Sequence, residues 1–67
     1  MTRTLLATFT SRVLALNAVS DFLDAGFINV AQEQDGQSTL VIVDAGDRPA
    51  EARTILERYG AVLEQNG

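Results

Sequence analysis

The stretch STLVIVDAGDRPAEARTILERYG, residues 38–60, decides the fold of this chain. Its first seven residues, 38–44, are apolar on both faces of an extended strand, which is typical of a central strand covered on both sides. Residues 49–59 then repeat apolar side chains along one stripe, with charged residues around the remainder, as in an amphipathic helix. Gly60 is suited to end that helix at the C′ position. The stretch predicts a central strand, a turn and a helix.

The sequence before this stretch predicts a first strand and a first helix. Residues 4–10, TLLATFT, are rich in β-branched and aromatic side chains and have apolar residues at Leu5, Ala7 and Phe9, the period of two expected of a strand. Ser11 can cap a helix over residues 12–25, which Gly26 ends. We expect one apolar side on this helix, made by Ala15, Val19, Phe22 and Leu23 and flanked by Leu16 and Ala18.

Two further strands complete the pattern. Residues 27–33 predict a second strand, because apolar Ile28 and Val30 alternate with Asn29. Asp35-Gly36 is a strong hairpin signal before the strand at 38–44. Residues 61–64 are long enough for a terminal edge strand. The order strand, helix, strand, strand, helix, strand predicts a single α+β domain over residues 1–67. We expect a ferredoxin-like sandwich with both helices on one face of an antiparallel sheet and the first and third strands central. A meander with unrelated helices is the competing interpretation.

Composition narrows the possible functions. The chain has 67 residues, no cysteine and no histidine, so thiolate chemistry and the commonest metal ligand are missing. Five arginines against nine acids give a net charge of −4, which disfavours binding to nucleic acid. No apolar run approaches the length of a membrane helix. We therefore expect a cytoplasmic protein without metal, cofactor, membrane or nucleic-acid partner.

One face of the predicted sheet is left without helices. If Leu5, Ala7 and Phe9 face the helices, the alternate residues of the first strand face outward. Either Leu40 and Ile42 or Val41 and Val43 must join them. A small domain buries little surface, and an exposed apolar face is unusual in a stable monomer. We predict a homo-oligomer, a dimer first, with the interface candidates Leu6, Thr8, Val41 and Val43, and a further protein partner is possible.

The turn DAGDRP offers the only candidate ligand chemistry. Asp44 and Asp47 are a weak pair for a cation, and the simpler interpretation is that Gly46 makes the turn before the helix. Gly46 and Arg48 at the helix start are candidates for binding an anion. No serine has a histidine base, so we expect no catalytic residues and no enzyme activity.

Several segments together resemble a known family. The segments FLDAGF, TLVIVDAG and AEARTILERYGAVLE follow a short strand that contains a Phe. In this order they are similar to the YflT-like domain of small bacterial general stress proteins, the heat-induced stress proteins. The matching residues are Phe9, Leu23, Gly26-Phe27, Ala52, Ile55-Leu56 and Gly60-Ala61. The resemblance implies a compact α+β domain and stress-associated expression, and it implies no catalytic residue.

Two functions therefore stay open. The first is a self-associating, non-enzymatic interaction module in stress physiology. The alternative is a regulatory domain similar to the ACT type, which binds an amino acid or anion at a subunit interface near Gly46 and Arg48.

Overall fold

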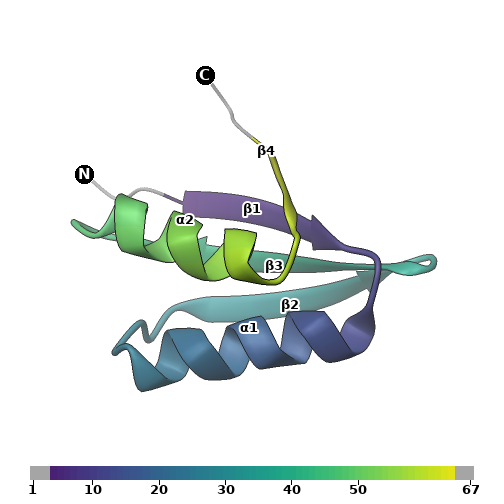
Figure 1. The fold of residues 1–67 in the computed structure, drawn as a ribbon, viewed down its shortest axis with the longest axis horizontal. Coiled ribbons are helices and arrows are strands. Elements are labelled where there is room, and N and C mark those ends of the chain that lie inside the picture. The colour runs from purple at the N-terminus through teal and green to yellow at the C-terminus, as the bar shows by residue number, and fades with distance from the viewer. Residues whose placement is uncertain (1–3, 65–67) are drawn as a thin grey trace.

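The fold, seen in a computed structural model that describes residues 4–64, is an α+β arrangement of four strands and two helices (Figure 1). The elements in chain order are β1 (Thr4–Phe9), α1 (Arg12–Asp24), β2 (Val30–Asp35), β3 (Ser38–Asp44), α2 (Pro49–Arg58) and β4 (Val62–Glu64).

The four strands form one antiparallel sheet in the order β2-β3-β1-β4. The first and third strands are central, as predicted, and β1 pairs with β3 along its whole length, from Thr4 opposite Asp44 to Phe9 opposite Thr39. β2 and β4 are the edge strands. The short β4 pairs only with the middle of β1, where its Leu63 lies opposite Ala7.

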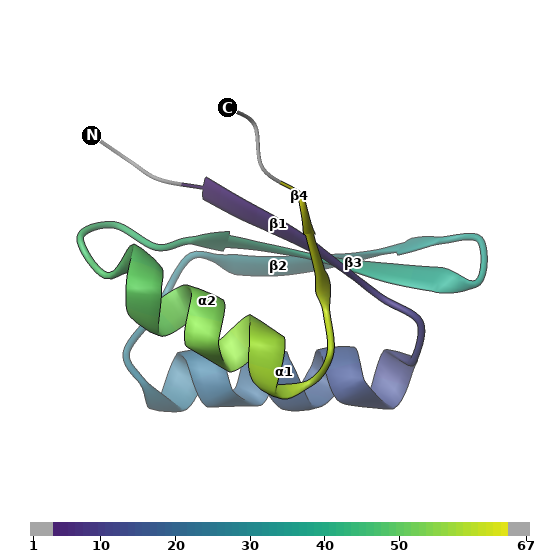
Figure 2. The same cartoon turned by 45° about the horizontal axis from the view of Figure 1, so that its top comes forward.

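Both helices lie on the same side of the sheet (Figure 2). Every second side chain of the central strands points toward the helices: in β3 these side chains are all buried, and in β1 Ala7 and Phe9 are buried and Leu5 is half-buried. The core between the two layers is a single cluster of apolar side chains, to which the sheet contributes Ala7, Phe9, Val41 and Val43 and the helices contribute Ala15, Ala18, Phe22, Ala52, Ile55 and Leu56. The sheet face opposite the helices remains open.

The helix ends follow the predicted chemistry. The Ser11 side chain caps α1, since its Oγ accepts a hydrogen bond from the Leu14 backbone N–H at 3.4 Å. Gly26 follows α1 with a φ of +93°, a left-handed conformation that glycine adopts without a steric penalty from Cβ. The backbone N–H of Phe27 then donates to the Phe22 carbonyl, which directs the Phe27 ring back into the core. The two rings meet edge to face, with centroids 5.4 Å apart.

Two local predictions are wrong. The second strand begins at Val30 and not at residue 27, because Phe27 is held by the end of α1 and Ile28 lies exposed in the connection. The helical apolar side is also misplaced: Leu23, expected in the core, is exposed, whereas Ala18 is completely buried. The buried line of α1 runs along Ala15, Ala18 and Phe22, and Leu23 lies outside it.

Candidate functional site

The open face of the sheet is the first candidate site. Leu6 of β1 lies directly opposite Ile42 of β3, and Thr8 lies opposite Leu40, so these four side chains form two adjacent rows. All four are half-buried by one another, without cover from a helix. Val62 of β4, opposite Thr8, extends the apolar surface and is 67% exposed. We call Leu6, Thr8, Leu40, Ile42 and Val62 the open-face patch.

Two of the predicted interface residues do not belong to this patch. Val41 and Val43, expected on the open face, are completely buried beneath the helices. Their pairing explains the difference, since Val41 lies opposite Ala7, whose side chain points into the core. Leu6 and Thr8 lie on the open face as expected, and the residues of β3 that join them are Leu40 and Ile42.

Acidic side chains border the patch on one side. Along β2, Ala31 pairs with Ile42 and Glu33 pairs with Leu40, which places both side chains on the open face. Glu33 and Asp35 are exposed. The face therefore has an apolar centre on the central strands and a negatively charged rim along β2.

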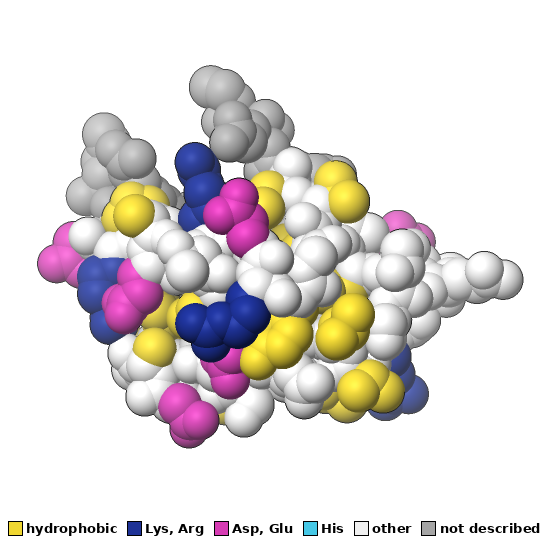
Figure 3. Space-filling model, in the orientation of Figure 1, with side chains coloured by type: hydrophobic (Ala, Val, Ile, Leu, Met, Phe, Trp, Pro, Cys, Tyr) yellow, Lys and Arg dark blue, Asp and Glu magenta, His cyan; other side chains and the backbone are white. Residues whose placement is uncertain are grey.

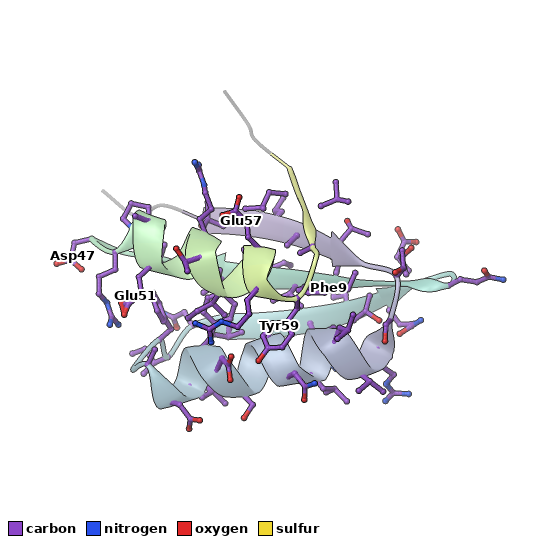
Figure 4. The ribbon with its side chains drawn as sticks, viewed as in Figure 1. Phe9, Asp47, Glu51, Glu57 and Tyr59 are labelled. Atoms are coloured by element: carbon purple, nitrogen blue, oxygen red, sulfur yellow. The ribbon has the colours of Figure 1, made fainter. Side chains whose placement is uncertain are left out.

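The turn between β3 and α2 is the second candidate site, and the structure brings its two predicted residues close together. Gly46 has a φ of +59°, and its backbone N–H donates to Asp44 Oδ1 at 3.1 Å. This closes an Asx-type turn that ends the strand. A shallow depression of about 220 Å³ lies beside the turn, lined by residues 26–29 and 44–48. Asp47 lies at the outer tip of the same loop (Figure 4).

The Arg48 guanidinium at this site already has partners within the protein. It lies over the Phe27 ring, with Cζ 4.2 Å from the ring centroid. Its Nη1 donates to the Ala25 carbonyl at 2.9 Å and to Glu51 Oε2 at 3.1 Å. Arg48 thus ties the start of α2 to the end of α1, and the acids beside it reduce the attraction of the turn for an anion.

A polar contact between the two helices is a feature that the sequence did not reveal. Asp21 of α1 accepts two hydrogen bonds through Oδ2, from the Tyr59 hydroxyl at 2.6 Å and from Arg58 Nη1 at 3.0 Å. Figure 4 shows Tyr59 pointing toward α1, whereas Glu57 lies on the other side of α2. The hydrogen bond to the Asp21 carboxylate, together with partial burial and the negative charge, raises the pKa of Tyr59.

A groove runs beside this contact. It has a volume of about 360 Å³ and is lined by Asp21, Asp24, Ala25, Glu51, Thr54, Ile55 and Arg58. Three carboxylates and one guanidinium give it a negative character. Within residues 4–64, no group of three or more acidic side chains is arranged to hold a metal ion. The helices of this part of the chain are also too short and too polar to cross a membrane.

Comparisons with protein-family models, curated proteins and solved structures found no match to this chain. The open-face patch and the Gly46 turn are the two candidate sites that the structure itself provides.

Proposed function

We propose that this chain is a non-enzymatic protein that self-associates as a dimer through the open-face patch. The observation that carries the proposal is the juxtaposition of Leu6, Leu40 and Ile42 on a sheet face that no helix covers. A contiguous apolar surface of this kind marks an interaction site more often than a free surface.

A second copy is the partner that this patch fits. A two-fold dimer places the same patch on both sides of the interface, so an apolar centre meets an apolar centre. Two sheets that pack face to face lie about 10 Å apart, which excludes water from the interdigitated side chains. A 67-residue domain also has little core of its own, and burial of the patch adds to its stability.

The charge of the chain opposes the dimer and gives it a salt dependence. Each copy carries a net charge of −4, and Glu33 lies at the rim of the patch. Added salt screens the repulsion between such copies, so the dimer strengthens with ionic strength.

We extend the proposal to the class and setting of the protein. The strand order β2-β3-β1-β4 and the two helices on one side support a ferredoxin-like fold. The resemblance of FLDAGF and TLVIVDAG to the YflT-like domain supports a cytoplasmic, stress-associated interaction module.

The ACT-like alternative has weaker support. It needs Arg48 to bind an anion or amino acid near Gly46, and that guanidinium already binds Ala25 and Glu51. A ligand at this site would raise the melting temperature by an amount that grows with the logarithm of its concentration. Titration with inorganic phosphate and with free amino acids tests this alternative directly.

Sedimentation velocity at micromolar concentration tests the dimer. We expect the parent protein to sediment as an assembly of two or more copies, and Ile42→Glu to sediment with fewer copies per particle and with unchanged far-UV circular dichroism. Ala50→Glu is the matched control, because it introduces the same charge at an exposed position of α2. A strictly monomeric parent, or an Ile42→Glu variant that sediments with as many copies as Ala50→Glu, would overturn the proposal.

A further inference from the structure

The helix α1 has a second apolar stripe that points away from the core. Val13, Leu16 and Leu23 are 65%, 46% and 56% exposed, respectively. Their spacing, with Ser20 between Leu16 and Leu23, is three, four and three residues, which places all four positions on one side of a helix. Figure 3 shows apolar side chains at the surface over the N-terminal half of α1. Since the opposite side of α1 is buried in the core, this helix is apolar on two sides.

The charges of α1 are reversed relative to its own dipole. Arg12 occupies the first turn and Asp24 the last, whereas a helix favours acids at its N-terminus and bases at its C-terminus. Between residues 4 and 64, neither side chain forms an ion pair. The placement of these two charges is therefore unfavourable within one copy.

We infer that the outer stripe of α1 packs against the same stripe of a second copy, with the two helices antiparallel. This alignment places Val13 opposite Leu23 of the second copy and Leu16 opposite Ser20, where the small serine leaves room for the leucine. The three-four spacing is that of a helix–helix seam.

Charge complementarity favours the antiparallel arrangement over a parallel one. In the antiparallel pair, Arg12 lies at the same level along the axis as Asp24 of the second copy, at both ends of the interface. The positive end of one helix dipole also lies beside the negative end of the other. A parallel pair would instead place like charges and like dipole ends together.

This interface does not depend on the open-face patch. α1 lies in the helical layer, and the patch lies on the opposite side of the sheet (Figure 2). A protein with two self-complementary surfaces on opposite sides can assemble beyond a dimer. The two interfaces can therefore be tested separately.

Disulfide trapping tests the pairing, and the absence of native cysteine leaves the introduced thiols as the sole reactive ones. In this test, Val13→Cys is mixed with an equal amount of isotope-labelled Leu23→Cys and oxidised with glutathione disulfide. Mass spectrometry then measures the proportions of mixed and identical dimers. Copies of Val13 in an antiparallel pair lie about 15 Å apart along the axis, because ten residues separate positions 13 and 23. A disulfide requires Cα atoms within about 7 Å, so only the mixed 13–23 bond can form readily.

The expected result is a mixed dimer far above the one-half proportion of random pairing. Arg12→Glu should reduce the trapped fraction, and Arg12→Glu combined with Asp24→Arg should restore it. Arg53→Cys, exposed on α2, is the control and should pair with Val13→Cys no better than at random. Random proportions, or dominant 13–13 dimers, would overturn the inference.

Repetition of the trapping in the Ile42→Glu background separates this interface from the open-face patch. The 13–23 bond should form as before, whereas its loss there would overturn an independent α1 interface.

Discussion

Arg48→Ala should destabilise the protein markedly, although the Arg48 side chain is 41% exposed. The guanidinium makes three contacts at the meeting point of the two helices: it covers the Phe27 ring, donates to the Ala25 carbonyl and pairs with Glu51. The carbonyl of Ala25 belongs to the end of α1, where the helix dipole is negative and a cation is favourable.

The size of the effect follows from these contacts. A hydrogen bond from a charged donor contributes about 1.5–3 kcal/mol, and a solvent-exposed cation above an aromatic ring contributes about 0.5–1 kcal/mol. The ion pair with Glu51 is solvent-exposed and adds less than about 1 kcal/mol. Because one side chain makes all three contacts, their energies do not add fully. We expect Arg48→Ala to lower the free energy of unfolding by about 2 kcal/mol.

Urea denaturation followed by circular dichroism measures this loss, and thermal denaturation should show a melting temperature lower by roughly 8–16 °C. The stability of Arg48→Lys should lie between those of the parent protein and Arg48→Ala, because lysine keeps the charge and loses the planar stack on Phe27. Arg53→Ala on the exposed side of α2 is the matched control and should change stability by less than about 0.5 kcal/mol. An Arg48→Ala variant as stable as Arg53→Ala would show that the contacts across the helix ends contribute nothing, and the reasoning would be refuted.

Three further outcomes are expected. The raised pKa of Tyr59 means that its hydrogen bond to Asp21 stabilises the fold fully below about pH 10, the unfolded value, and is lost as the pH rises through the folded pKa. Urea titrations from pH 7 to 11 should show this alkaline loss in the parent and a smaller loss in Tyr59→Phe. Val41→Ala should cost about 2 kcal/mol of unfolding free energy and Leu40→Ala about 1 kcal/mol or less, since only Val41 is fully buried; equal costs in a monomeric background would contradict the assigned faces. Gly46→Ala should cost roughly 1–2 kcal/mol through backbone strain alone, because an added Cβ meets no atom within 4 Å; an unchanged urea midpoint would exclude that strain.

The period of the side chains was sufficient to predict the order of the strands and helices, although the second strand begins three residues later than expected. The central position of β1 and β3 followed from the topology that this order implies. The period did not decide which face of β3 is buried, because Leu40, Val41, Ile42 and Val43 are all apolar. In a strand that is apolar on both faces, either face can be buried with a similar gain in hydrophobic free energy. The register of its pairing with the neighbouring strand then determines which face is buried. Here Val41 pairs with Ala7, whose side chain already points toward the helices.

The contacts at the candidate sites could not be predicted from the sequence, because the residues that form them are far apart along the chain. Arg48 binds Phe27 and Ala25 more than 20 residues away, and Tyr59 binds Asp21 at a separation of 38 residues. Nothing in the local pattern distinguishes Arg48 from an arginine available to a ligand. The Gly46 turn was predictable, in contrast, because its hydrogen bond to Asp44 spans only two residues.

The two helices differ in a way that bears on assembly. α2 has one buried stripe and a charged remainder, so a single layer of contacts satisfies it. α1 buries Phe22 on one side and exposes Leu16 and Leu23 on the other, which is the pattern of a helix covered on both sides. The sheet also has an apolar surface away from the core, since Ile42 lies on the face that no helix covers. The self-association that we propose through the open-face patch and the outer stripe of α1 would cover both surfaces.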